Sequence, residues 1–187
     1  VFIIWALDNK KNIHGFIIDK NSTGLSTSII EKASLKISPT GQIILNDVKV
    51  PKKNILPNTQ GWKSIYSCLN KARYGIAWGV MGAAEKSWFI AKDYVENRFM
   101  FKKKLAANQL IQNKLANMQT EISLGLSACL HTGKAMDNKK DLKIAISMLK
   151  RNNCHKALKI VRNARDMLGA NGLLEEYHII RHLINLE

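Results

Sequence analysis

The sequence predicts an α+β fold in which a β-rich segment is followed by a bundle of long helices. Three observations support this prediction. Short runs rich in Ile, Val and Phe occupy the first 57 residues. From about residue 64 onward, apolar residues recur at every third or fourth position. A proline-bounded segment, P-K-K-N-I-L-P, lies between the two parts. We therefore expect two domains, 1–57 and 58–187.

The β-rich segment contains four candidate strands, separated by turn-forming sequences such as N-S-T-G and P-T-G. The strands are V-F-I-I-W-A-L, G-F-I-I-D-K, S-T-S-I-I-E-K-A-S-L-K-I and Q-I-I-L-N-D-V-K-V. Proline lacks the N–H group that a sheet or a helix interior needs. The segment from Pro51 to Pro57 is therefore expected to be a linker that continues neither structure.

Four helical segments are expected after the linker. Three cover about 64–98, 108–136 and 142–168, and an amphipathic run after Gly172 adds the fourth. Helices of this length that are joined by short polar loops normally pack antiparallel. The sequence therefore predicts an antiparallel helical bundle.

Glycines interrupt the helical pattern in two places. Gly75, Gly79 and Gly82 lie near one face of the first helix, where each costs about 1 kcal/mol relative to Ala. We expect a second helix to approach the backbone closely there. The third helix ends at R-D-M-L-G-A-N-G. That stretch is either a plain helix stop or a backbone that a phosphate or cofactor approaches, and the pattern alone leaves both open.

The chain is strongly basic, with 29 Lys and Arg against 14 Asp and Glu and a net charge of +15. These charges are scattered in short clusters without a single basic stripe, so no nucleic acid partner is expected. A basic helical binding module remains the alternative from a different functional class. No apolar run approaches the roughly 20 residues that a bilayer crossing needs, so no membrane span is expected.

Three cysteines without a C-x-x-C pair, Cys68, Cys129 and Cys154, argue against a disulfide framework and indicate a reducing compartment. The protein is therefore expected in the mitochondrial matrix if eukaryotic or in the cytoplasm if bacterial, and not to be secreted. The chain starts with a strand-like run and shows neither an initiator Met nor a basic leader. We expect it to be truncated at its front.

Few residues indicate chemistry by pattern alone. His178 and His182 share a helix face at a spacing of four, but no third ligand stands at a recognisable spacing, so we expect no metal site. Arg73 stands at the start of a strongly apolar helix. A charge beside buried surface is costly unless it is paired or faces a ligand, and a solvated helix end is the alternative.

Several long segments resemble one protein family. They are N-K-A-R-Y-G-I-A-W-G-V-M-G-A-A-E, A-N-Q-L-I-Q-N-K-L-A-N-M-Q-T-E-I-S-L-G-L, L-K-R-N-N-C-H-K-A-L-K-I-V-R-N-A-R-D-M-L-G-A-N-G and E-Y-H-I-I-R-H-L-I-N-L-E. These sequences closely resemble the acyl-CoA dehydrogenase family, and within it the glutaryl-CoA dehydrogenases. The similarity extends over nearly the whole chain.

The resemblance implies a fold and an activity. Members have an N-terminal helical domain, a middle β-domain and a C-terminal four-helix bundle, and they assemble as homotetramers around FAD. The chain resembles part of the middle β-domain followed by most of the bundle. A glutamate removes the α-proton of an acyl-CoA thioester, and a hydride passes from the β-carbon to the flavin. Glutaryl-CoA dehydrogenases, in lysine and tryptophan degradation, then decarboxylate the product to crotonyl-CoA, and electrons leave through an electron-transfer flavoprotein. A dehydrogenase for another short-chain or branched acyl-CoA is the alternative.

The resemblance also assigns site residues. It implies FAD contacts at Arg98 in N-R-F-M-F and at Gln109 in N-Q-L-I-Q. For the cofactor of a neighbouring subunit it implies contacts at Asp166, Met167, Leu168, Gly169 and Ala170. The planar guanidinium of an Arg can hydrogen-bond two phosphate oxygens at once, and Gly169 can both end the helix in a left-handed cap and leave the backbone open to a cofactor. The acyl-CoA-binding segment corresponds to Tyr66, Ser67, Cys68, Leu69, Asn70, Lys71, Ala72 and Arg73.

The chain departs from the family at three places. The F-G-x-P-L turn is F-K-K-K-L here, so Lys102 and Lys104 replace a glycine and a proline. If that glycine has a positive φ, Lys102 strains or reshapes the turn. Ala170 replaces a second glycine, which affects the fit of the backbone to FAD. The catalytic glutamate is expected in a Y-E-G-T-like loop just beyond Glu187, which does not match it. We therefore expect no catalytic residue in this chain and no activity from it alone.

Overall fold

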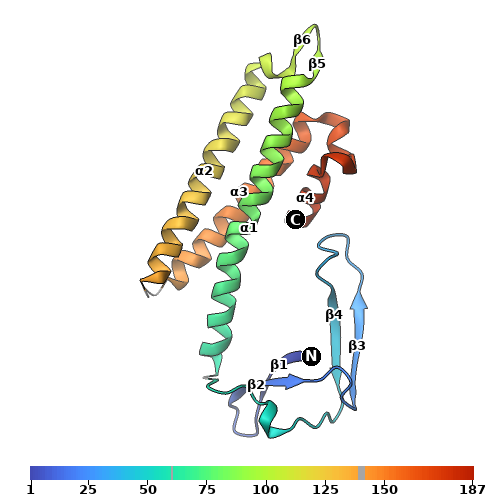
Figure 1. Cartoon of the computed structure of the whole chain (residues 1–187), viewed down its shortest axis with the longest axis vertical. Coiled ribbons are helices and arrows are strands. Elements are labelled where there is room, and N and C mark those ends of the chain that lie inside the picture. Colours follow the sequence, from blue (N-terminus) through green and yellow to red (C-terminus); the bar gives the residue numbers. More distant parts are fainter. Residues whose placement is uncertain (60, 139–141) are drawn as a thin grey trace. The chain divides into compact units, whose positions relative to one another are not determined.

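The computed structural model describes residues 1–59, 61–138 and 142–187 (Figure 1). The chain forms two compact units, Val1–Leu69 and Asn70–Glu187. Helix α1, Trp62–Asn97, begins in the first unit and continues in the second. Strands build most of the first unit and helices build most of the second, which confirms the predicted α+β class. The expected domain limits, 1–57 and 58–187, stay a proposal.

Two antiparallel hairpins build the first unit. β1, Phe2–Leu7, pairs with β2, Ile13–Ile18, and β3, Leu25–Ile30, pairs with β4, Thr40–Leu45. The four expected strands are confirmed, but the third and the fourth end earlier than their apolar patterns predict, the fourth at Leu45 instead of Val50. The chain leaves β3 after Ile30, and Leu35 in the following loop has a positive φ of 49° that a strand cannot contain.

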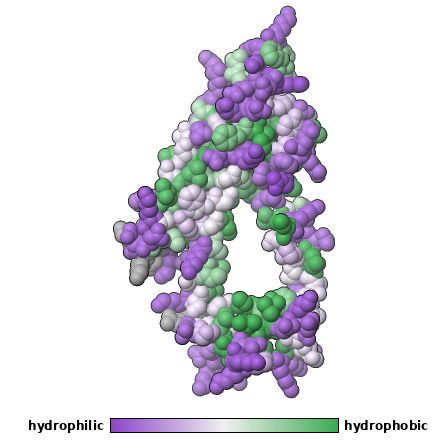
Figure 2. All heavy atoms as spheres, in the orientation of Figure 1, coloured by the Kyte–Doolittle hydropathy of each residue, from purple (hydrophilic) through white to green (hydrophobic). Residues whose placement is uncertain are grey.

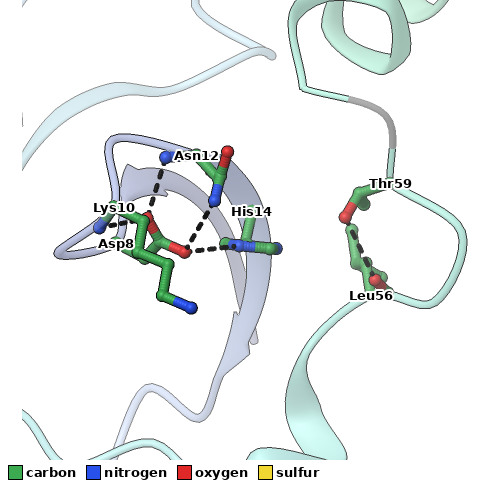
Figure 3. A network of polar contacts seen from close by, with 6 residues as sticks. All are labelled: Asp8, Lys10, Asn12, His14, Leu56 and Thr59. Carbon is green, nitrogen blue, oxygen red and sulfur yellow. Dashed lines mark hydrogen bonds and ion pairs between the residues drawn. The ribbon is translucent and has the colours of Figure 1, made fainter.

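A carboxylate closes the turn between β1 and β2 (Figure 3). Asp8 Oδ1 accepts hydrogen bonds from the backbone N–H groups of Lys10 and Asn12, both at 2.8 Å. Asp8 Oδ2 lies 3.1 Å from His14 Nε2. The N–H of Asn12 is the largest cause that lowers the pKa of Asp8 below its ordinary value. Asp8 is therefore ionised at neutral pH and holds the turn in which Lys11 has a φ of 63°.

The proline-bounded segment packs against β2, which corrects the expectation of a linker. It contains the 3-10 helix η1, Lys52–Asn54. The Leu56 N–H donates to the Gly15 carbonyl at 2.8 Å, and Asn54 Nδ2 donates to the Ile17 carbonyl at 3.1 Å. A Cβ on Gly15 would lie 2.6 Å from Leu56 Cδ1, so a larger residue here would displace the Leu56 side chain. Hydrophobic residues gather over this part of the first unit (Figure 2).

The second unit is a helical bundle. Besides α1 it contains α2, Gln109–Asp137, α3, Lys143–Met167, and α4, Ile179–Leu186. Successive helices α1, α2 and α3 run antiparallel (Figure 1), and their limits match the expected ranges to within two residues. No helix within the described residues combines the length and the apolar character that a membrane crossing needs.

The fourth helix is shorter than predicted. After α3 the chain forms two 3-10 turns, η3, Gly169–Leu173, and η4, Glu175–Tyr177. It becomes α-helical only after His178, whose φ of 59° is incompatible with a continuous helix. The amphipathic spacing after Gly172 predicted one helix because periodicity does not report a single left-handed residue.

Buried side chains from all four helices form one core. Apolar residues of α1, α2, α3 and α4 contact one another there and are almost fully excluded from solvent. Burial of each such side chain stabilises the fold by about 1.5–3 kcal/mol. The largest of them are Met81, Val95, Met118, Ile122, Val161 and Ile179.

One amide is buried among the helices. Asn153 of α3 is fully buried, and its Nδ2 donates to the carbonyls of Ala77 in α1 at 3.2 Å and of Gly125 in α2 at 3.4 Å. A buried amide that loses such partners costs about 1–3 kcal/mol.

The glycines of α1 do not mark a contact between helices, so that expectation is wrong. A Cβ built on Gly75, Gly79 or Gly82 would meet nothing within 4 Å in the part of the chain that the structure describes. The close approach lies at Gly125 of α2, where a Cβ would clash with Met81 Sδ. The repeat in α1 therefore lies on an open helix face.

A tight hairpin joins α1 to α2. β5, Phe99–Met100, pairs with β6, Lys103–Lys104. Phe101 and Lys102 form the two-residue turn, with φ values of 51° and 66°. Two left-handed residues are typical of a type I′ turn, which favours Asn-Gly. Lys102 therefore keeps a glycine-like conformation at the cost of backbone strain.

Replacing Lys102 with Gly is expected to stabilise the protein. A left-handed conformation costs a residue other than glycine about 1 kcal/mol or more, so the thermal unfolding midpoint should rise by a few degrees. Lys103→Gly, at a paired strand position, is the control and should lower the midpoint. A midpoint that falls equally in both variants would contradict the proposed strain.

Candidate functional site

The ends of three helices enclose a cavity of about 400 Å³. Arg98 follows the last residue of α1, Lys114 lies near the start of α2, and Asp166 lies in the last turn of α3. The full lining is Tyr94, Arg98, Met100, Leu105, Ile111, Lys114, Asp166, Met167, Leu168, Gly169, Ala170 and Asn171. The fold thus brings Arg98 together with the whole segment from Asp166 to Ala170. The volume suits one part of a cofactor.

Arg98 provides a free cation in this cavity. Its side chain is exposed and makes no hydrogen bond or ion pair with the described residues. Its backbone is fixed, because the Arg98 N–H donates to the Tyr94 carbonyl and the Arg98 carbonyl accepts from the Leu105 N–H, both at 2.9 Å. An anchored backbone with an unpaired guanidinium is suited to bind an anion.

An ion pair forms part of the cavity wall. Lys114 Nζ donates to Asp166 Oδ2 at 2.5 Å, and Arg165 Nη2 lies 3.8 Å from Asp166 Oδ1. The hydrogen bond from Lys114 is the largest cause that lowers the pKa of Asp166. Asp166 is therefore ionised at neutral pH and is balanced by a cation.

Two glycines shape the segment after α3, each for a different reason. Gly169 follows the helix with a φ of 58°, so the expected left-handed cap is confirmed. A Cβ on Gly169 would meet nothing within 4 Å, which leaves this backbone open. A Cβ on Gly172 would clash with the carbonyl oxygen of Arg165. Ala170 is exposed beside Gly169, and its side chain does not close the cavity.

Gln109 lies apart from this group. It is the exposed first residue of α2 and is not among the residues that line the cavity. Its neighbour Asn108 donates from Nδ2 to the Leu105 carbonyl at 3.0 Å. The structure thus brings together every predicted FAD residue except Gln109.

The expected acyl-CoA segment runs along the beginning of α1. In the first unit, Tyr66, Ser67, Cys68 and Leu69 are exposed, and the Tyr66 ring lies 6.0 Å from the ring of Trp62. In the second unit, Lys71 and Ala72 are exposed, and Arg73 is half-buried.

Arg73 has no carboxylate partner within the described chain. Its Nη1 donates to Asn70 Oδ1 at 3.3 Å, a contact within the same helix. The guanidinium keeps four further N–H donors for a ligand or solvent. Both interpretations of Arg73, a ligand-facing charge and a solvated side chain, are compatible with this placement.

Residues 59–186 match the family model of the acyl-CoA dehydrogenase C-terminal domain. The chain belongs to the acyl-CoA dehydrogenase family. It is similar to the short-chain-specific acyl-CoA dehydrogenase of Megasphaera elsdenii, with 29% identity over 98% of this chain and 49% of the relative. It is equally similar to the glutaryl-CoA dehydrogenase of Desulfococcus multivorans, with 30% identity over 97% of this chain and 48% of the relative. The chain thus spans about half the length of these acyl-CoA dehydrogenases.

A solved member of the family shows the same fold. It is a glutaryl-CoA dehydrogenase from Mycobacterium smegmatis in complex with FADH2, with a TM-score of 0.92 and 36% identity. The match covers 98% of this chain and 48% of that one. FAD is the cofactor of acyl-CoA dehydrogenases.

The cavity fits the anionic part of such a cofactor. FAD contains a diphosphate, which Arg side chains and open backbone N–H groups bind well. Within the described residues Arg98 has an unpaired guanidinium, a Cβ on Gly169 would meet nothing within 4 Å, and the carboxylate of Asp166 is already paired with a cation. The donor set therefore agrees with FAD.

His178 and His182 were weighed above as metal ligands. The described residues contain no group of three or more His, Cys, Asp or Glu side chains arranged to hold a metal ion. His182 Nε2 is buried and has no hydrogen-bond partner among the described residues. Burial is the largest cause that lowers the pKa of His182, and the nearby charges of Arg181, His178 and Lys86 lower it further. His182 is therefore a packed, neutral side chain of the acyl-CoA dehydrogenase bundle.

Mild acid is expected to destabilise the bundle through His182. Because its folded pKa lies below the ordinary value of 6.5, the unfolded chain takes up the proton first. Stability is fully present above pH 6.5 and falls as the pH drops below it. We expect the urea midpoint to decrease between pH 7.5 and 5.5, and His182→Gln to flatten this decrease. An equally steep decrease in the variant would assign the effect to another group.

Sequence reasoning missed six residues of the cavity lining: the apolar Met100, Leu105 and Ile111, and three polar residues. The polar residues are Lys114, Tyr94 and Asn171, and Asn171 Nδ2 donates to Tyr94 Oη at 3.0 Å. The ring of Tyr94 also lies edge-on to that of Tyr177, with centroids 5.8 Å apart. These contacts join α1 to η3 and η4. The polar Asn171 between the two glycines of G-A-N-G was the one local sequence feature that could have indicated a residue of this cavity.

Proposed function

We propose that the protein is an FAD-dependent dehydrogenase that oxidatively decarboxylates glutaryl-CoA to crotonyl-CoA. The observation that supports this most is the cavity that joins the free cation of Arg98 to the open backbone at Gly169. The resemblance of the sequence to glutaryl-CoA dehydrogenases supports the choice of substrate. We also propose the homotetramer and the electron-transfer flavoprotein as partners, since the resemblance implies both.

The residues of this chain have distinct proposed roles. The guanidinium of Arg98 binds the phosphates of FAD, and the backbone at Gly169 donates to the same anionic group. Arg73 and the preceding turns of α1 from Tyr66 lie on the acyl-CoA side. Bound FAD supplies the acceptor for the hydride that leaves the β-carbon of the thioester.

The general base is proposed to lie outside these 187 residues. Glu187 already accepts hydrogen bonds from the guanidinium of Arg162, which supports a structural role for its carboxylate. We propose that residues 1–187 alone do not oxidise acyl-CoA, because proton abstraction requires a carboxylate within reach of the α-carbon.

The function is tested on the purified full-length protein. We expect bound FAD, reduction of an acceptor dye with glutaryl-CoA, and release of one CO2 for each crotonyl-CoA formed. Butyryl-CoA and isovaleryl-CoA serve as comparison substrates. Faster turnover of either without CO2 release would support the short-chain or branched-chain alternative, which the equally similar Megasphaera elsdenii relative favours. A colourless protein that does not respond to added FAD would overturn the proposal.

A further inference from the structure

Two lysine–carboxylate pairs join α2 to α3 in the described part of the chain. Lys114 pairs with Asp166, and Lys156 pairs with Glu121, both at 2.5 Å. The four side chains are partly exposed, so neither pair is a buried structural ion pair. They differ in location, because Lys114 and Asp166 line the cavity with Arg98, whereas Lys156 and Glu121 line a neighbouring cavity that Lys114 also borders.

The carboxylate of Asp166 is unexpected in a cavity proposed to bind a diphosphate. A carboxylate facing phosphate oxygens repels them, and this repulsion is strong where water is excluded. Asp166, however, accepts from the ammonium of Lys114. An ammonium has three N–H donors, so one bond to Asp166 leaves two for other acceptors.

We propose that Lys114 is a second anion-binding cation of this cavity and that Asp166 is a positioning residue that holds the Lys114 ammonium in place. This inference rests on the proposed binding of FAD. A lysine side chain is flexible, and a fixed partner lowers the entropy that it loses when it binds an anion. Asp166 therefore acts on the cofactor through Lys114, and the diphosphate meets two cations, Arg98 and Lys114.

The experiment measures the dissociation constant of FAD for the full-length protein by equilibrium dialysis at several salt concentrations. We expect Lys114→Met to weaken binding about tenfold, as for the loss of one charge-assisted hydrogen bond, and to make the dissociation constant less dependent on salt. Lys114→Arg keeps the cation, so its dissociation constant for FAD should lie within about threefold of that of the original protein. Lys156→Met removes the matched ion pair and should change neither value.

Asp166→Asn distinguishes two possible effects of the Asp166 carboxylate on FAD binding, the positioning of Lys114 and the direct repulsion of the cofactor. If Asp166 only repelled the cofactor, its removal would tighten binding, because the cavity gains positive charge. We expect weaker binding instead, by about threefold or more, because Lys114 is no longer held. The thermal unfolding midpoint of each variant is measured without FAD. If a variant is less stable than Lys156→Met, its weaker FAD binding can reflect lost stability. In that case the comparison of Lys114→Met with Lys114→Arg, which keeps the cation, decides the role of Lys114.

Several outcomes would overturn the inference. Tighter FAD binding in Asp166→Asn would show that Asp166 only repels the cofactor and does not position Lys114. Unchanged binding in Lys114→Met, together with weakened binding in Arg98→Ala, would remove Lys114 from the site and leave the proposed function intact. A full-length protein that binds no FAD at any salt concentration would overturn both proposals.

Discussion

Arg98→Ala is expected to weaken the retention of FAD by the full-length protein about ten- to a hundredfold. Hydrogen bonds to a charged group contribute about 1.5–3 kcal/mol, and each 1.4 kcal/mol corresponds to a factor of about ten. The guanidinium makes no ion pair or hydrogen bond with the described residues. Its loss therefore removes a ligand contact without leaving a buried partner unsatisfied.

Stability should hardly change in the same variant. Surface substitutions away from packed features usually alter the free energy of unfolding by less than about 0.5 kcal/mol. FAD content after gel filtration and the thermal midpoint of the apoprotein check the two expectations separately. Arg151→Ala, an exposed arginine of α3 that does not line the cavity, is the matched control. Equal FAD content in both variants would count against the role of Arg98.

Gly172→Ala is expected to destabilise the protein by about 2–3 kcal/mol, in the range of overpacked sites. The added methyl group would clash with the backbone carbonyl of Arg165, and backbone cannot move aside as a flexible side chain does. The η3 turn must shift away from the end of α3 and would disturb Gly169 to Asn171 in the cavity wall. FAD retention should fall together with the thermal midpoint.

Gly169→Ala provides the comparison three residues earlier. Its Cβ would meet nothing within 4 Å, so only the left-handed φ of 58° opposes the substitution. That strain costs about 1 kcal/mol, less than the clash at Gly172. Chemical denaturation of both variants measures the difference. If Gly169→Ala proved the more damaging, the assignment of steric crowding to Gly172 would be wrong.

Local patterns predicted the regular elements well. The repeat of apolar residues at three-to-four spacing gave the limits of α1, α2 and α3 closely, because each helix buries one continuous face. The same patterns failed where one residue redirects the chain. Leu35 and His178 both have positive φ. Leucine rarely adopts this conformation, and the enrichment of histidine in it is too small to predict a single position.

The cavity was predictable in part. The resemblance to acyl-CoA dehydrogenases indicated Arg98 and the segment ending at Ala170, and the fold brings them together. Lys114 was missed because its partner Asp166 belongs to another helix, and a single sequence carries no signal for a pairing between distant residues. Gln109 was indicated by the same resemblance but lies outside the lining.

The buried amide of Asn153 limits how the helices can slide past one another. Contacts between aliphatic side chains are not directional, so they constrain the axial position of a helix less than hydrogen bonds do. An amide that donates to carbonyls on two neighbouring helices is satisfied at one axial setting only. Since helices are stiff, this setting also influences the axial positions of Arg98, which follows α1, and of Asp166, which lies in the last turn of α3. A polar group in the interior thus helps to keep the cation and the carboxylate in the lining of one cavity.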